Sequence, residues 1–206
     1  FVVPDATGQA TSNVYLDNGT FTVTLNVTDG QNISNIDTLT VTVTDLTPSS
    51  NLFANTSTIN EGATVLYNAS LSTSSPDAIA KYEWDFNYDG SFNVDLDSAL
   101  TPTATKQFND NGTFVVAVKV TDDDGSTNIS TVTTTVNDLT PTANSGIDRS
   151  INEGQTVALD GSLSTSGGAA DLISLYEWDF NYNGAVFDVD ATGVTNTTTS
   201  YNDMEY

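Results

Sequence analysis

The sequence predicts an all-β chain made of tandem β-sandwich repeats. One segment, residues 82–90, returns almost unchanged at residues 176–184, as YEWDFNYDG and YEWDFNYNG. Several stretches alternate apolar and polar residues with the period of two that is typical of half-buried strands. Helical periodicity of useful length occurs nowhere in the sequence.

The repeat has a period of about 93 residues: residues 15–21 match residues 108–114, and the Asp-Leu-Thr-Pro segment at Asp45 returns at Asp138. This period suits a self-contained domain of about 100 residues and is too long for a solenoid repeat. We therefore expect the C-terminal part of a first domain (1–46), a complete domain (47–139) and the N-terminal part of a third (140–206), with Pro48 and Pro141 stiffening the boundaries. Because residues 187–201 resemble residues 1–15, we expect a piece of a longer protein.

The complete domain is expected to be a seven-stranded sandwich. Apolar and polar residues alternate at 21–27 and at 114–120, and Asp-Gly turns lead from each of these strands into the next, which indicates two hairpins. We interpret the Trp in the middle of the 82–86 strand as a core anchor in preference to a ligand platform. The predicted buried residues are Trp84, Phe86, Phe114, Val116, Val118 and Val120.

Composition limits the partners and the chemistry. Four basic residues face 27 acidic ones, and the net charge of −23 at pH 7 disfavours nucleic acid and anionic lipid as partners. The same charge suits either cation binding or a soluble acidic surface. Without cysteine or histidine, disulfides, thiolate sites and the usual zinc and triad chemistry are excluded, and oxygen is the abundant ligand atom. The sequence has no run of 18 apolar residues, so we expect no membrane-spanning segment in it.

Three spaced motifs resemble the PKD (polycystic kidney disease) family of immunoglobulin-like β-sandwiches. They are Tyr82-Glu-Trp-Asp-Phe86 with the turn Asp89-Gly90, then Phe108 with Gly112 and Phe114, and finally Val118-Lys-Val-Thr-Asp122. The third repeat departs from the family pattern, because the segment from Tyr201 to Tyr206 lacks the glycine. The resemblance implies a structural or adhesive extracellular module without catalysis, commonly in tandem arrays on microbial surface proteins or beside secreted hydrolases.

The loop after the Trp strand is a candidate Ca²⁺ site. Asp85, Asn87 and Asp89 alternate ahead of Gly90, as in the first half of a calcium loop whose alternate side chains face one centre. Oxygen ligands at this spacing favour Ca²⁺ over transition metals. The alternative is an Asx-rich turn, because Asp and Asn also bond their own backbone in turns.

The third repeat fits the calcium loop better than the second. Asp190 follows Asp179 by eleven residues, the spacing that closes such loops, whereas Leu96 occupies the closing position in the second repeat and Asp95 or Asp97 would have to replace it. The predicted ligands are Asp85, Asn87, Asp89, Asp95, Asp97, Asp179, Asn181, Asn183, Asp188 and Asp190.

Two further sets of carboxylates are considered as metal ligands. Asp122, Asp123 and Asp124 repel one another unless they are solvated or bridged, and in a hairpin turn such residues are usually solvated. Near the domain boundaries, four carboxylates could share an ion that stiffens the junction: Asp45, Asp138, Glu61 and Glu153.

Eight Asn-x-Ser/Thr sequons are candidate glycosylation sites. Chance explains most of them, because the chain is rich in Asn, Ser and Thr, and the two Asn-Gly pairs also suit tight turns. The candidates are Asn18, Asn26, Asn32, Asn55, Asn68, Asn111, Asn128 and Asn196.

We expect a structural tandem-repeat segment of a secreted or cell-surface protein or extracellular filament, stiffened by Ca²⁺. Its partners would be further repeats of the same chain or copies of itself. The alternatives are an adhesive module that binds glycans or another cell's surface, and an accessory spacer of a secreted hydrolase. We expect no enzyme, because no nucleophile and base can be paired and no two carboxylates are placed across a cleft.

Overall fold

The computed structural model describes residues 6–168, 170–193 and 197–200, and for residues 197–200 it describes the backbone alone. All regular structure in this part of the chain is β-strand, which confirms the predicted all-β class. No helix among the described residues is long and apolar enough to cross a membrane. The chain divides into two compact units: unit 1 is Phe1–Asn55, Leu66–Ala104 and Val115–Thr133, and unit 2 is Thr56–Val65, Thr105–Phe114 and Thr134–Tyr206.

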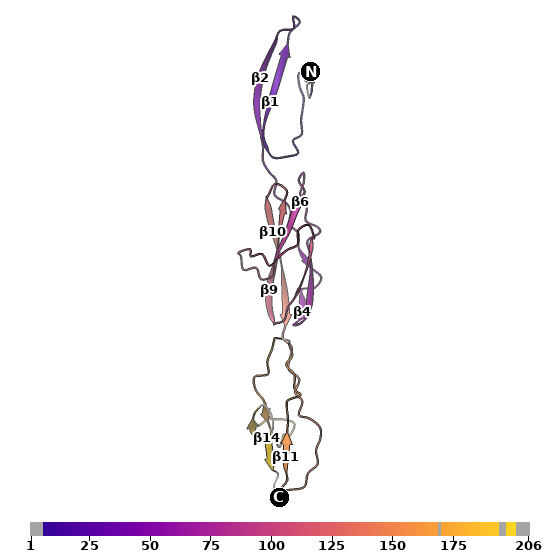
Figure 1. Ribbon diagram of the computed structural model, residues 1–206, viewed down its shortest axis with the longest axis vertical. Helices are drawn as coiled ribbons and strands as arrows, with labels where there is room; N and C mark the ends of the chain where they lie inside the picture. The colour runs from indigo at the N-terminus through magenta and orange to yellow at the C-terminus, as the bar shows by residue number, and fades with distance from the viewer. Residues whose placement is uncertain (1–5, 169, 194–196, 201–206) are drawn as a thin grey trace. The chain divides into compact units, whose positions relative to one another are not determined.

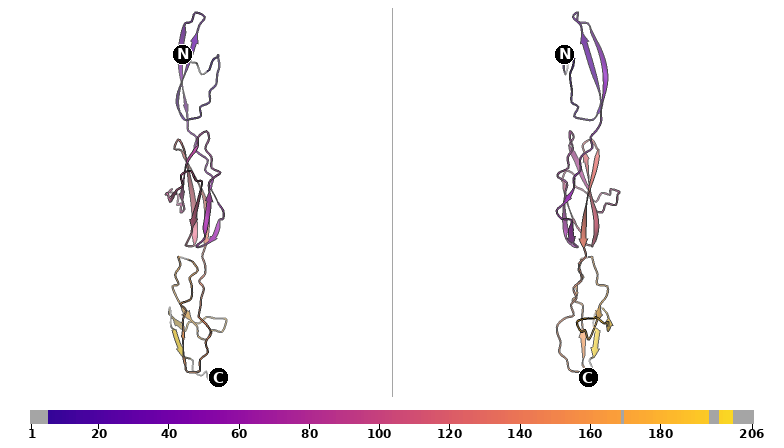
Figure 2. Two further views of the ribbon diagram at one scale, coloured as in Figure 1. Left: turned by 45° about the vertical axis from the view of Figure 1, so that its right-hand side comes forward. Right: turned by 180° about the vertical axis from the view of Figure 1, so that it is seen from behind.

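Unit 1 begins with the hairpin of β1 (Gly19–Thr28) and β2 (Ser34–Val43), which appears as a two-stranded ribbon in both views of Figure 2. The strands pair antiparallel without a break from Gly19 opposite Val43 to Thr28 opposite Ser34. Asp29 forms the turn, because its Oδ1 accepts the N–H groups of Gln31 and Ile33 at 2.8 and 2.9 Å. The predicted hairpin is therefore confirmed.

The complete domain expected at residues 47–139, called the complete repeat from here on, forms two sheets (Figure 1). The five-stranded sheet has the order β4 (Thr58–Asn60), β10 (Thr127–Asn137), β9 (Gly112–Asp122), β6 (Ile79–Asp85), β7 (Leu96–Asp97). The three-stranded sheet has the order β3 (Phe53–Ala54), β5 (Thr64–Asn68), β8 (Thr103–Gln107). The prediction of seven strands was wrong, because β3 and β4 pair in different sheets although they adjoin in the sequence, and the two-residue β7 extends the larger sheet.

The core of unit 1 lies where the two sheets face each other. The ring of Tyr67 on β5 lies 6.1 Å from the ring of Phe86 at the end of β6. The Trp84 side chain is fully buried, and its Nε1–H donates to Ser98 Oγ at 2.9 Å. These contacts confirm Trp84 as a core anchor, and the prediction of burial is also confirmed for Phe86, Val116, Val118 and Val120.

One predicted core residue lies at the edge of the core. Phe114 is half-buried, because it stands near the beginning of β9, where its ring packs on Phe108 at 4.8 Å. Gly112 precedes it with a φ of 147°, and a Cβ there would lie 3.4 Å from the Phe114 ring. The glycine therefore permits both the positive φ and the close approach of the ring.

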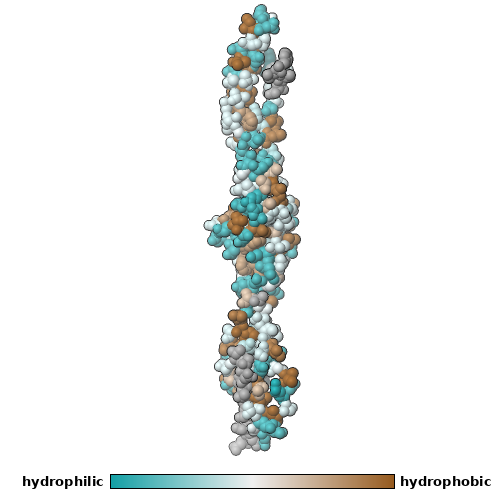
Figure 3. Space-filling view, in the orientation of Figure 1, coloured by the Kyte–Doolittle hydropathy of each residue, from teal (hydrophilic) through white to brown (hydrophobic). Residues whose placement is uncertain are grey.

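Unit 2 carries two short strand pairs in the third repeat. β11 (Thr156–Leu159) pairs antiparallel with β14 (Thr197–Ser200), and β12 (Glu177–Trp178) pairs with β13 (Ala191–Thr192). Many apolar side chains of this region are exposed, among them Leu172, Tyr182 and Phe187. Brown side chains are accordingly visible on the surface of the third repeat in Figure 3.

Candidate metal centre

The loop after β6 is held by backbone hydrogen bonds to its own carboxylates. Asp85 is 2% exposed, and its Oδ1 and Oδ2 accept the N–H groups of Asn87 and Asn93 at 3.0 and 2.8 Å. Asp89 Oδ1 accepts the N–H of Ser91 at 2.9 Å. The bonds from Asn87 and Ser91 are Asx turns, in which a short polar side chain takes the place of a backbone acceptor, and the bond from Asn93 closes the loop onto Asp85.

The closing carboxylates of the same loop also have protein partners. Asp95 Oδ2 accepts the N–H of Phe86 at 2.7 Å. Asp97 lies on β7, where its Oδ1 accepts the N–H of Ala99 at 2.9 Å and its Oδ2 pairs with Lys81 Nζ at 3.2 Å. Asp97 is therefore part of an ion-pair network on the sheet.

The loop of the third repeat has the same bonds. Asp179 accepts the N–H groups of Asn181 and Asp188, both at 3.0 Å, and Asp190 Oδ2 accepts the N–H of Phe180 at 2.7 Å. Asn183 Oδ1 accepts the N–H of Ala185 at 2.9 Å. Both loops contain the Asx turns of the alternative interpretation, and the calcium loop stays a prediction.

Three carboxylates from distant segments meet in unit 1, and we call Asp45, Asp77 and Asp122 the unit 1 carboxylate group. One carboxylate oxygen from each lies within 4.8 Å of the others. Asp122 is only 2% exposed; its Oδ1 accepts the N–H of Ser126 at 2.8 Å, and its buried Oδ2 has no hydrogen-bond partner. Asp45 Oδ2 accepts a hydrogen bond from Ser126 Oγ, while its buried Oδ1 has no partner.

The surroundings of this group are anionic. Burial raises the pKa of Asp77 above its ordinary value, and the charges of Asp45, Asp123, Asp122 and Asp17 raise it further. Asp123 Oδ1 accepts the N–H of Ala78 at 2.9 Å, which ties the loop before β6 to the turn after β9. Backbone hydrogen bonds therefore hold like charges together in this part of unit 1.

A second set of three carboxylates lies in unit 2, and we call Glu61, Asp110 and Asp171 the unit 2 carboxylate group. One carboxylate oxygen from each again lies within 4.8 Å of the others. Glu61 is 5% exposed; its Oε1 accepts the N–H of Leu139 at 2.6 Å, and its Oε2 has no hydrogen-bond partner. Although the Leu139 N–H lowers the pKa of Glu61, burial and the charges of Asp171 and Asp138 raise it above its ordinary value.

The sequence therefore identified only some members of these groups. Asp45, Glu61 and Asp122 were considered as ligands, and Asp138 lies close enough to influence the pKa of Glu61, whereas Glu153 is exposed and belongs to neither group. Asp77, Asp110 and Asp171 were missed. The available signal was the repeat itself, because Asp77 and Asp171 occupy equivalent positions just ahead of the two Trp strands.

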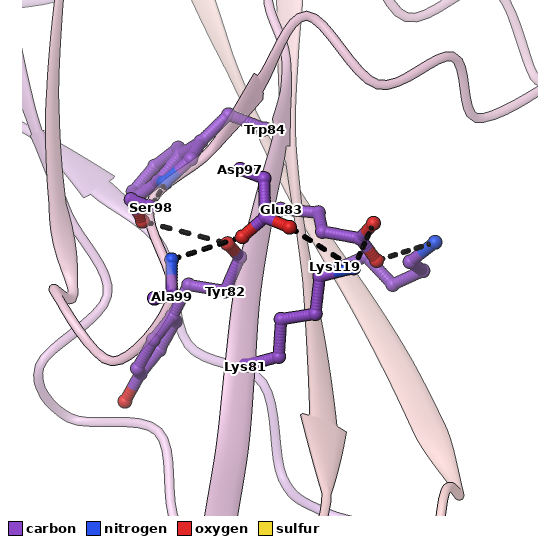
Figure 4. Close-up of polar contacts among 8 residues, drawn as sticks. All are labelled: Lys81, Tyr82, Glu83, Trp84, Asp97, Ser98, Ala99 and Lys119. Carbon is purple, nitrogen blue, oxygen red and sulfur yellow. Dashed lines mark hydrogen bonds and ion pairs between the residues drawn. The ribbon is translucent and has the colours of Figure 1, made fainter.

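Sequence reasoning also missed an ion-pair network on β6 (Figure 4). The Glu83 carboxylate forms ion pairs with Lys81 Nζ and Lys119 Nζ, both at 2.7 Å, and the Glu83 side chain is 10% exposed. Lys119 Nζ also lies 4.7 Å from the centre of the Phe92 ring. Burial raises the pKa of Glu83, but the bonds from Lys119 and Lys81 outweigh it and hold the pKa below its usual range. The sequence signal for these ion pairs was the presence of two of the four basic residues, Lys81 and Lys119, in or next to predicted strands of a strongly acidic chain.

The sequons are mostly exposed. Of the eight candidates, Asn196 lies outside the described residues and Asn68 is half-buried, while the other six are exposed. The Asn18 and Asn128 Nδ2 groups donate hydrogen bonds to Asp124 Oδ2 and to the Pro48 carbonyl, at 3.0 and 2.9 Å. A glycan on either nitrogen would compete with these bonds.

Unit 2 also has an aromatic hollow of about 620 Å³ within residues 141–187. Its walls include Tyr176, Trp178, Tyr182 and Phe187. The buried Nε1 of Trp178 has no hydrogen-bond partner, unlike that of its counterpart Trp84. The hollow therefore exposes apolar surface of the kind that the complete repeat encloses in its core.

Comparison with known proteins finds one family model that matches most of the complete repeat. The model of the PKD domain matches residues 46–136. Similar solved structures include carbohydrate-binding modules of the β-sandwich superfamily, with 23% identity over 61% of this chain and 53% of that one and a TM-score of 0.42. This chain thus spans about half the length of that structure.

Two other similar structures are bacterial PKD1 domains. That of Vibrio anguillarum Epp is 26% identical over 45% of this chain and 96% of that one, with a TM-score of 0.35. That of the Vibrio cholerae metalloprotease PrtV is 24% identical over 44% and 98%, with a TM-score of 0.34. None of the curated proteins matches the sequence.

Proposed function

Residues 46–136 match the PKD domain model, and from this premise we propose that the chain is a structural, non-catalytic segment of a secreted or cell-surface protein. Its partners are further repeats of the same chain or other copies in a filament or surface array. The observation that carries the proposal is the PKD match over a sandwich with a fully enclosed aromatic and aliphatic core. A net charge of −23 suits a soluble surface in contact with cations.

Single-molecule pulling on the full chain tests the structural role. A load-bearing sandwich gives way in one cooperative step, so unfolding of the complete repeat should release roughly 300 Å of chain, at about 3.3–3.6 Å for each of its residues. Extension without a resolved force peak would contradict a load-bearing role. Antibody labelling of intact producing cells tests the location, and label that enters only after permeabilisation would contradict a surface protein.

Glycan binding is the second candidate, and the aromatic hollow of unit 2 favours it. Sugar rings pack on exposed aromatic faces, and Tyr182 and Phe187 are 58% and 53% exposed at the hollow. A glycan array probed with the full chain tests this candidate. Tyr182→Ala should abolish any signal, whereas Tyr88→Ala, the equivalent change in the complete repeat, should leave it intact. Equal signals from the two variants, or no signal from the wild type, would exclude the hollow as a glycan site.

A further inference from the structure

The unit 1 carboxylate group contains more negative charge than its protein partners compensate. Three carboxylates contribute oxygens within 4.8 Å of one another, and the buried Oδ2 of Asp122 and Oδ1 of Asp45 have no hydrogen-bond partner. The ion pairs of Lys81 and Lys119 go to Glu83 and Asp97 and not to this group. A buried carboxylate oxygen without a partner is costly unless a positive charge is supplied.

We propose that Asp45, Asp77 and Asp122 bind one Ca²⁺ ion. Ca²⁺ takes six to eight oxygen ligands and accepts carboxylates with one or both oxygens. The site has only oxygen donors, which favours a hard cation over a transition metal. The hydrogen bonds that Ser126 gives to Asp122 Oδ1 and Asp45 Oδ2 orient the two carboxylates and leave the partnerless oxygen of each available to the ion.

The ion would join three segments that are distant in the sequence. Asp45 follows the β1–β2 hairpin, Asp77 precedes β6, and Asp122 ends β9. Binding would therefore restrain the linker that leads into the complete repeat, which goes beyond the structural role proposed above. The unit 2 carboxylate group has the same two features. Asp171, the counterpart of Asp77, lies close to Glu61, and the buried Oε2 of Glu61 has no hydrogen-bond partner.

Calcium titration of the full chain after treatment with EDTA tests the site, with Asp122→Asn as the main variant. The amide keeps the Oδ1 acceptor for Ser126 and removes the charge. Asp29→Asn is the matched control, because Asp29 occupies the equivalent turn of the β1–β2 hairpin, also accepts backbone N–H groups through Oδ1, and is exposed. We expect calorimetry with CaCl₂ to show one equivalent of Ca²⁺ fewer for Asp122→Asn than for Asp29→Asn.

The thermal midpoint provides a second readout. Ca²⁺ that binds only the folded state raises the midpoint, so millimolar Ca²⁺ should raise it more in the wild type and Asp29→Asn than in Asp122→Asn. If Asp122→Asn does not fold by circular dichroism, Asp77→Asn, at a half-buried position, replaces it with the same expectation. Equal calcium stoichiometry in the variant and the control, or no calcium binding by the wild type, would overturn the proposal and leave the structural role untouched.

Discussion

The hairpins β1–β2 and β9–β10 share a sequence pattern and differ in environment. Three apolar residues of β1 are 38%, 57% and 59% exposed, whereas their counterparts 93 residues later in β9 are fully buried; the pairs are Val23 and Val116, Leu25 and Val118, and Val27 and Val120. In the described part of the chain, β1 pairs only with β2, while β9 lies between β6 and β10. Alternation therefore specifies a strand, and burial depends on the strands that lie next to it and across from it.

The largest effect expected from this difference is at the two Trp residues. Trp84→Ala should lower the free energy of unfolding by about 3–5 kcal/mol, because it removes a fully buried indole and leaves a cavity. Trp178→Ala should cost clearly less, because that side chain is only half-buried. Urea unfolding followed by far-ultraviolet circular dichroism measures both. An equal loss in the free energy of unfolding for the two variants would show that the third repeat buries its Trp as fully as the complete repeat does.

The second comparison uses one substitution at equivalent positions of the hairpins. Val120→Ala should destabilise the complete repeat by about 2 kcal/mol, from lost burial and the cavity that remains. Val27→Ala changes a side chain that is 59% exposed and should stay within about 0.5 kcal/mol of the wild type. The urea midpoint followed by tryptophan fluorescence distinguishes them. A cost at Val27 near that at Val120 would mean that the β1 face is covered in solution.

These comparisons also show which parts of the fold could be predicted from the sequence. The hairpins and the Trp84 core follow from local signals, namely alternation, Asp-Gly turns and a Trp in the middle of a strand. Alternation could not predict the burial of both faces of β6, where Glu83 and Asp85 are 7% and 2% exposed. Their burial depends on Lys119 of the neighbouring strand and on the backbone of the 87–93 loop.

The candidate metal site shows the same limit. Spacing within one loop pointed to Asp85 and Asp179, whose oxygens the structure pairs with backbone N–H groups. The unit 1 carboxylate group joins residues 45 and 122, which only the folded chain brings together. Local spacing detects ligands that are close in sequence and cannot detect a group assembled from three segments.

The smallest expected effect concerns Glu83 and its counterpart Glu177. Glu83→Gln should cost about 1 kcal/mol at pH 7, because the bonds from two partly exposed lysines lose their charged acceptor. Glu177→Gln should cost nothing measurable, because Glu177 is exposed and the positions equivalent to Lys81 and Asp97 hold Leu175 and Ala191.

The pH dependence gives a second measurement on the same pair. The pKa of Glu83 is lower in the folded state than the ordinary value of 4.5, so its stabilising effect is present above that value and is lost as the pH falls through the folded-state pKa. The difference between wild type and Glu83→Gln in urea unfolding should therefore be constant near pH 7 and shrink below about pH 4.5. A difference that persists unchanged at pH 3 would attribute the cost to packing of the glutamine and not to the lysine pairs.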